Sequence, residues 1–442
     1  MKFARCAPLV FLLAAFAAQA DISFTVTRGA TAPTPIAVVP FAQPPNVGVD
    51  IAQVVAADLD RSGVFKTLPR SDMTLEKPTD LSQVNLRNWR MLSQNDLVIG
   101  TVTLDPVVPN KVLVGFRLIN VYGSDSPQQN LLLSQDNFTL SDADWQHAKP
   151  REAWRHLAHQ VANRIYERLT GVRGVFDTRI AYVTSSGLGQ SRHYELNYAD
   201  ADGDDKHVIA RNKEPLMSPA WSPDGRKLAF VGFERGNSAI YIQTLATGEL
   251  LKFVGEKGIN GAPSWSPDGS RLAVTLSFEH NPDIYIIDLG TKSRRRITTD
   301  FGIDTDANWS PDGRTLAFVS DRGGQPQIYT VSADGGPQTR LTFEGKRNEQ
   351  PRYAPDGKSL VEVQDFHIAI MDLQSHSVRV LTPGPLDEDP SFAPNGKMLM
   401  YTTRGPQGEQ MATISVDGNV QTSVGDESNV RNPAWSPFSS PN

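Results

Sequence analysis

The stretch "PAWSPDG", residues 219–225, decides the fold because close relatives of it recur through the second half of the chain. "PSWSPDG" begins at residue 263, "ANWSPDG" at 307, "PRYAPDG" at 351 and "PSFAPNG" at 390, and "PAWSPF" at 433 begins a sixth copy. The aromatic residues of the six copies are spaced by 44, 44, 44, 39 and 43 residues. A period near 40 residues is that of one supersecondary unit and predicts a repeat architecture.

Each repeat has the same internal order. In the first complete copy, the turn is followed by the apolar run "LAFVGF" (228–233), then by "IYIQTL" (240–245) and the more polar "LLKFV" (250–254). Continuous apolar runs are typical of strands that are covered on both faces. With the short strand that carries the aromatic residue, each repeat has four strands, which predicts one blade of a β-propeller.

The local chemistry of the repeated stretch supports this interpretation. In Ser-Pro-Asp-Gly, proline presets φ at the second turn position and glycine accepts the positive φ that ends a tight hairpin. The preceding tryptophan is large enough to fill the space between two sheets. We therefore expect these aromatic residues to be core residues between blades and not a surface that stacks on a ligand.

The two ends of the repeat region complement each other. Three strands, "RIAYVTSS" (179–186), "YELNYAD" (194–200) and "KHVIAR" (206–211), have no aromatic strand before them, whereas "PAWSPF" has no strand after it. Joining them closes a ring and removes the exposed sheet edges of an open array. The sequence predicts an all-β six-bladed β-propeller closed by the C-terminal strand, over residues 175–442.

The region before the repeats predicts a mixed α/β domain over residues 21–170. "PIAVVPF", "DLVIGTVTLD", "KVLVGFRLINVY" and "LLLSQDNFTL" are typical of strands, and "VGVDIAQVVAADLDRSG" is typical of a helix. A second helix, which places Trp154, Leu157, Val161 and Ile165 on one apolar stripe, ends before Gly171. Residues 171–174 are then the linker to the propeller.

The first twenty residues have the pattern of a secretory signal peptide, with Lys2 and Arg5 before an apolar run and a small-x-small ending at Ala20. The only cysteine, Cys6, lies inside this segment, so the exported chain would fold without disulfides. This pattern favours the bacterial periplasm. Without residues 1–20 the chain has 41 basic and 49 acidic residues, which argues against nucleic acid or anionic lipid as a partner. We expect a monomer with no transmembrane segment.

The loops that enter the six innermost strands should meet at one mouth of the channel. They contain Asp304, Asp306, Glu349, Asp387, Glu388 and Asp389, so an acidic mouth is expected. Such a mouth favours a basic or amide-rich protein segment and could hold a cation in the channel; the alternative is that these are solvated loops. No other cofactor is indicated.

The repeated phrase, behind a signal peptide and a small α/β domain, resembles the TolB family of Tol-Pal system proteins over essentially the whole exported chain. "PIAVVPF", "PAWSPDGRKLAFVGFERGNSAIYIQTLATGE" and "NGAPSWSPDG" carry the resemblance most specifically. Tyr353, Phe392 and Asn395 depart from the family phrase, and the fourth repeat is shorter. The resemblance implies a non-enzymatic component of the Gram-negative envelope that supports outer-membrane integrity during cell division.

The resemblance also implies partners and sites. The lipoprotein Pal would bind the propeller mouth, and TolA would bind the N-terminal segment; other Tol or outer-membrane proteins and bacteriocins could use the same surfaces. "INGA" and Thr305 match the positions that the family uses against Pal. The predicted mouth site is Asn260, Gly261, Ala262, Asp304, Thr305, Asp306, Glu349, Asp387, Glu388 and Arg431.

The predicted TolA-binding segment is Asp21, Ile22, Phe24 and Val26, in which the apolar side chains alternate as in a strand. Such a strand either packs on its own protein or adds to the sheet of a partner. The family resemblance favours a strand that switches between the two.

An enzymatic alternative is a propeller hydrolase or lactonase with a metal at the channel mouth. The six mouth loops contain no histidine, and the chain contains no Gly-x-Ser-x-Gly stretch. His156 and His159 are spaced like metal ligands, but no third ligand is evident and we expect them to be solvated. "DADGDD" from Asp200 lacks the glycine and glutamate of a calcium loop and is predicted to be a surface hairpin.

Overall fold

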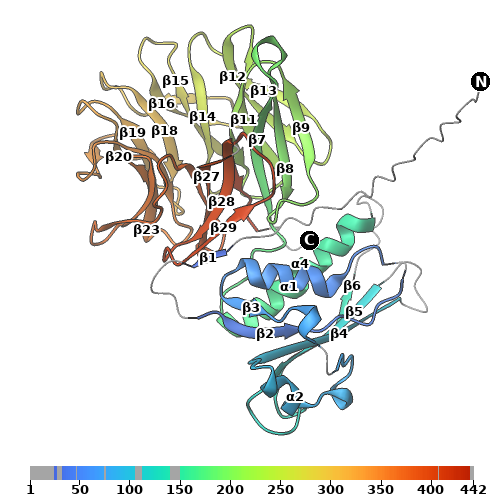
Figure 1. The fold of residues 1–442 in the computed structure, drawn as a ribbon. Helices are drawn as coiled ribbons and strands as arrows, with labels where there is room; N and C mark the ends of the chain where they lie inside the picture. The colour runs from blue at the N-terminus through green and yellow to red at the C-terminus, as the bar shows by residue number, and fades with distance from the viewer. Residues whose placement is uncertain are drawn as a thin grey trace, which may run out of the picture.

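The computed structural model describes residues 24–26, 32–45, 47–73, 76–104, 112–139, 150–406 and 408–438. An α/β domain and a β-propeller lie one below the other in Figure 1, as the sequence predicts. Within the described ranges, no helix combines the length and apolar character needed to cross a membrane. The predicted signal peptide lies outside the described residues.

The α/β domain contains a mixed five-stranded sheet in the order β3-β2-β4-β5-β6. β2 runs parallel to β3 and β4, whereas β4, β5 and β6 are antiparallel. The strands are β2 (Thr34–Val38), β3 (Phe65–Thr67), β4 (Asp96–Leu104), β5 (Val112–Asn120) and β6 (Leu131–Thr139). The four longer strands confirm the predicted runs; β3 is too short to have been recognised.

Two helices pack together on one face of this sheet (Figure 1). α1 (Ile51–Arg61) begins where the Asp50 side chain accepts a hydrogen bond from the Gln53 amide, and α4 (Pro150–Thr170) buries the predicted apolar stripe. The shorter α2 (Leu86–Met91) buries Trp89 against the other face. Two 3₁₀ turns, η1 (Arg70–Asp72) and η2 (Leu81–Gln83), precede α2.

The propeller contains six antiparallel blades. Blades 1 to 5 are numbered in chain order, and the blade that closes the ring is blade 6. Blade 1 is β10 (Leu216–Trp221), β11 (Lys227–Glu234), β12 (Asn237–Thr244) and β13 (Leu250–Val254). Blade 2 is β14 (Asn260–Trp265), β15 (Arg271–Leu276), β16 (Asp283–Asp288) and β17 (Arg294–Arg296). Blade 3 is β18 (Asp304–Trp309), β19 (Thr315–Ser320), β20 (Gln327–Ser332) and β21 (Gln338–Arg340).

The remaining blades include the closing one. Blade 4 is β22 (Asn348–Tyr353), β23 (Ser359–Gln364), β24 (His367–Asp372) and β25 (Val378–Val380). Blade 5 is β26 (Glu388–Phe392), β27 (Met398–Gly405), β28 (Gly408–Ser415) and β29 (Val420–Val424). Blade 6 is β30 (Val430–Trp435), β7 (Arg179–Ser186), β8 (His193–Asp200) and β9 (His207–Asn212), with the 3₁₀ turn η3 (Gly189–Ser191) between β7 and β8.

The ring closes as predicted, because the last strand pairs with the first strand of the repeat region. β30 is antiparallel to β7, with Val430 opposite Thr184 and Trp435 opposite Ile180. The Ser436 amide extends this pairing by donating to the carbonyl of Arg179 at 2.8 Å. Both ends of the propeller are therefore held in one sheet.

The repeated tryptophans join neighbouring blades. The indole Nε1 of Trp265 donates to the carbonyl of Ala220 and that of Trp309 to the carbonyl of Ser264, both at 3.1 Å. Each acceptor lies on the innermost strand of the preceding blade. The predicted role between blades is confirmed, with a directed hydrogen bond in addition to the packing.

Blade 5 has a fifth strand, contributed from the beginning of the chain. β1 (Phe24–Val26) pairs antiparallel with the outer strand β29, with Phe24 opposite Thr422 and Val26 opposite Val420. Figure 1 shows β1 beside β29, on the side of the propeller that faces the α/β domain. In this structure residues 24–26 are docked on the propeller of their own protein.

Candidate functional site at the channel mouth

Among the described residues, the α/β domain contacts the propeller at one end, where α4 pairs with the β8–β9 hairpin. At that end, which carries the Ser-Pro-Asp-Gly turns, Asn395 Nδ2 donates to the carbonyl of Arg173 at 3.0 Å and Trp435 Nε1 donates to Thr178 Oγ1 at 2.8 Å. Asn395 occupies the position where other repeats have aspartate, and only an amide can donate this bond. The mouth, where the innermost strands begin, lies at the opposite end.

The mouth is built from a backbone feature repeated in all six blades. Each innermost strand contains an irregularity in its pairing with the next strand. The residue at that point has a left-handed backbone, with φ between 47° and 58°, although it is never glycine. These bulge residues are Ser218, Ala262, Asp306, Gln350, Asp389 and Asn432. Bulges of this kind re-aim side chains, and here all six line the channel.

Hydrogen bonds between bulge residues connect only part of this ring. The backbone amide of Asn432 donates to Asp389 Oδ2 at 3.0 Å, and Gln350 Nε2 donates to Asp389 Oδ1 at 2.9 Å. The backbone amide of Ser218 donates to Asn432 Oδ1 at 3.3 Å. Ala262 has no polar side chain with which to continue the series. The bulge residues of blades 2 and 3, Ala262 and Asp306, therefore stand outside this series.

The predicted mouth residues divide into two groups. Gly261, Ala262, Thr305, Asp306, Glu349 and Glu388 line a channel cavity of about 710 Å³. Arg431 lines a smaller adjoining cavity.

The side chains of Asn260, Asp304 and Asp387 are buried instead. Asn260 Nδ2 donates to the carbonyls of Ser238 and Glu256, and Asp304 accepts from Arg322 Nη2 at 2.8 Å with both oxygens. Asn260 and Asp304 thus fix the start of their strands and position the exposed groups beside them.

The mouth is less acidic than the loop sequences suggest. Arg352 Nη1 lies 3.1 Å from Asp306 Oδ1, and Arg347 Nη2 lies 2.7 Å from Glu349 Oε2. Arg347 belongs to a mouth loop and Arg352 follows that loop directly, so the signal was present in the sequence. The two arginines therefore offset the negative charges of Asp306 and Glu349.

The acidic character is concentrated at blade 5. Burial, together with the neighbouring Asp389, raises the pKa of Glu388, and burial also raises the pKa of Asp389. Two adjacent carboxyls whose ionised forms are disfavoured would gain from a cationic or hydrogen-bond-donating partner. This side of the mouth is suited to lysine, arginine or amide groups.

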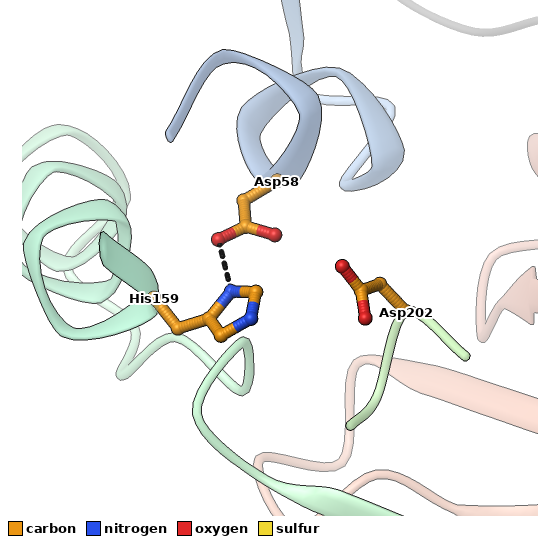
Figure 2. A group of neighbouring side chains, drawn as sticks. All are labelled: Asp58, His159 and Asp202. Atoms are coloured by element: carbon orange, nitrogen blue, oxygen red, sulfur yellow. Dashed lines mark hydrogen bonds and ion pairs between the residues drawn. The ribbon is translucent and has the colours of Figure 1, made fainter. Parts of the chain in front are cut away.

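A second polar cluster lies where the two domains meet (Figure 2). His159 is buried, and its Nδ1 lies 2.7 Å from Asp58 Oδ2. Arg155 forms ion pairs with Asp200, Asp202 and Asp204 of the β8–β9 hairpin. Burial opposes the charged form of His159, but Asp58 and the hairpin carboxylates outweigh it and raise its pKa to about 10.

This cluster corrects two expectations. His159 is not solvated, and the "DADGDD" hairpin is not a free surface turn, because the α/β domain and the propeller cover both. Helical periodicity placed His159 correctly away from the stripe against the sheet, but it carries no information on a second domain that covers the opposite face.

Two groups of side chains among the described residues have the spacing of metal ligands: Asp58 with His159 and Asp202, and Glu152 with Asp205 and His207. Both involve the domain junction, and neither lies at the channel mouth. In the first group, Arg61 also pairs with Asp58 and Asp202, so cationic side chains already compensate these carboxylates.

The fold and its open mouth define a class of two-domain protein, in which an α/β domain holds one end of a closed six-bladed propeller and leaves the other end accessible. A family profile described as the TolB amino-terminal domain matches residues 22–126, and one described as the TolB beta propeller domain matches residues 166–439. The chain therefore belongs to the TolB family.

Similar proteins are called Tol-Pal system protein TolB. Those from Xanthomonas campestris pv. campestris and Xanthomonas oryzae pv. oryzae are 44% identical over 260 residues, which is 58% of this chain and 54% of theirs. The chain thus spans about half the length of these curated relatives.

Solved structures extend the likeness. A crystal structure of TolB from Acinetobacter baumannii matches 95% of this chain and 100% of its own, with a TM-score of 0.81 and 34% identity. A chain of a nidogen/laminin complex has a TM-score of 0.50 at 11% identity over 59% of this chain and 99% of that one, and shows the propeller fold alone.

Proposed function

We propose that this protein is a non-enzymatic, periplasmic protein-binding component of the Tol-Pal system, which binds Pal at the channel mouth and TolA through its N-terminal segment. Its relatives carry the name of that system. The role would link two envelope proteins, support outer-membrane integrity and cell division, and need no cofactor.

The observation that carries the proposal is the accessible half of the mouth. Gly261, Ala262 and Thr305 lie on neighbouring blades, line the channel cavity and lie at the beginning of their strands, at the end opposite the α/β domain. Small side chains at a bulged backbone allow a partner to approach closely. The carboxyl groups of Glu388 and Asp389 on the other side would receive donor groups from the same partner.

The N-terminal segment supports the second half of the proposal. β1 forms a three-residue ladder on the edge of blade 5, and short ladders contribute little stability alone. Its release would free a strand with alternating apolar residues to add to the sheet of a partner. Asp21 and Ile22 lie outside the described residues and belong to the proposal only.

The test for the mouth is capture of purified Pal by the exported chain and by the variants Ala262→Arg and Thr305→Arg. Both place a long cation where small side chains line the cavity, so the dissociation constant is expected to rise at least about tenfold. Thr247→Arg is the matched control, since Thr247 is an exposed threonine in the β12–β13 turn at the other end of blade 1.

Undiminished capture by both mouth variants, with circular dichroism showing folded protein, would mean that Pal does not bind at the channel mouth. For the second half, deletion of residues 21–32 should abolish TolA binding and leave Pal capture intact. TolA binding that survives the deletion would contradict the assignment of this segment.

A further inference from the structure

A groove on the propeller lies between the outer parts of blade 6 and blade 1. It has a volume of about 1020 Å³ and is lined by the end of β9, by β11 and β12, and by the loop that follows β13. Half-buried Phe233 and exposed Leu250 form its accessible apolar part, beside the buried stacked pair Phe230 and Tyr241, whose ring centroids lie 5.7 Å apart.

A glycine on β11 allows close packing under the groove. Gly232 lies opposite Leu216 in blade 1, at the position that Leu276 occupies opposite Asn260 in blade 2. A Cβ atom at Gly232 would lie 3.1 Å from Cε2 of Tyr241, so glycine lets the tyrosine ring pack over the strand. Blade 2 fills the corresponding space with leucine.

The charges around the groove are unbalanced. Two of its three glutamates are in ion pairs, Glu234 with Lys252 and Glu256 with Arg294. Glu214 accepts from the amide of Gly236 and contributes one uncompensated negative charge. In contrast, Lys213, Arg235 and Lys257 are exposed and form no ion pair with any described residue. The chain as a whole has a net charge of −6, so this basic surface runs against the overall charge.

A smaller cavity lies between the groove and the channel, as its lining residues show. This cavity of about 300 Å³ shares Leu216 with the groove, and shares Met217 and Ser218 with the channel cavity. An extended chain that occupies the mouth could therefore run outward between blades 6 and 1. Along that path it would pass from the carboxyl groups of Glu388 and Asp389 to the three free cations.

We propose that this groove, defined by Lys213, Arg235, Lys257 and the apolar residues Phe233 and Leu250, binds an extended acidic peptide segment that carries an aromatic or apolar side chain. Phe233 and Leu250 would receive the apolar side chain, and the cations would pair with the carboxylates. The inference rests on the proposed function in one respect, since a protein partner at the mouth is the reason for choosing a polypeptide over another polyanion.

The experiment uses the exported chain and a fluorescein-labelled octapeptide, Glu-Glu-Phe-Glu-Glu-Tyr-Glu-Glu, with binding measured by fluorescence anisotropy in 50 mM salt. The triple variant Lys213→Glu, Arg235→Glu and Lys257→Glu should weaken binding about tenfold or more, because each pair contributes modestly and screening is weak at low salt. The control reverses Arg226, Lys227 and Lys358, three exposed cations at the turn end of the propeller, and should leave binding unchanged.

A second variant tests the shape of the groove. Gly232→Ser introduces the residue that blade 3 has at this position, Ser320, and should weaken binding without changing the groove's charge. Folding of each variant is checked by circular dichroism.

Each remaining outcome decides between the alternatives. Equal binding by the wild type and the triple variant, or loss of binding only in Thr305→Arg, would overturn the proposal. Binding of a heparin hexasaccharide with no binding of the octapeptide would overturn the peptide assignment. Failure of Pal capture with intact octapeptide binding would contradict the proposed function and leave the groove's chemistry standing.

Discussion

Replacement of Glu362 should change how the stability of the propeller depends on pH. This side chain lies on β23 and is fully buried, and neither of its carboxylate oxygens has a hydrogen-bond partner among the described residues. It faces Ala369 across the strands, where blade 3 has the pair Phe318 and Tyr329. Burial raises its pKa to about 8.

The direction of this pH dependence follows from the number of protons that the folded and unfolded states bind. In the unfolded chain the carboxyl ionises near its ordinary pKa of 4.5, whereas in the folded propeller it keeps its proton up to about pH 8. Between these values the folded state binds one more proton, so stability falls as pH rises. Each pH unit costs about 1.4 kcal/mol, which gives a loss of about 3 kcal/mol by pH 7.

The assay is thermal unfolding of the exported chain from pH 5 to pH 9, followed by circular dichroism, for the wild type and Glu362→Gln. Glutamine keeps the shape but cannot ionise, so the difference in unfolding temperature should grow in its favour by several degrees between pH 5 and pH 8. Glu249→Gln, at an exposed glutamate in a turn, is the control. A difference in unfolding temperature between the wild type and Glu362→Gln that does not change with pH would show that Glu362 does not keep its proton in the folded propeller.

Three further substitutions probe the contacts that hold the domains and blades. Asp58→Asn removes a charge from the buried pair with His159 and should cost about 3 kcal/mol in urea unfolding; a loss below about 0.5 kcal/mol would contradict the pairing. Trp309→Phe removes the hydrogen bond to the Ser264 carbonyl and should cost about 1 kcal/mol in the same assay, whereas unchanged stability would mean that packing alone matters. Asn395→Asp cannot donate to the linker carbonyl, so limited proteolysis should cut the linker faster, and an unchanged cleavage rate would count against this contact.

The repeats made the propeller predictable from the sequence, because one phrase with fixed turn chemistry specifies both the blade and its neighbour. The incomplete first and last repeats also predicted closure, which the pairing of β30 with β7 confirms. Asn395, in contrast, makes a contact that the repeats do not predict. The sequence shows it only as a departure from the phrase, whereas in the structure its amide donates to the carbonyl of Arg173 in the linker, which the repeat pattern does not contain.

The site was harder to predict because exposure depends on contacts distant in the sequence. Asn260 and Asp304 lie in the predicted mouth loops, but Ser238 and Arg322 draw their side chains inward. The six left-handed bulge residues share no side-chain type, so no residue pattern in the sequence predicts them. His159 was misjudged for a similar reason, since its partner Asp58 is 101 residues away.

Amide hydrogen exchange with and without saturating Pal shows whether Pal binds the mouth at blades 2 and 3. Binding there should slow exchange in the strands and loops that contain Gly261, Ala262 and Thr305, with no change in the turns at the opposite end of the propeller. Protection confined to the α/β domain or to those turns would contradict it.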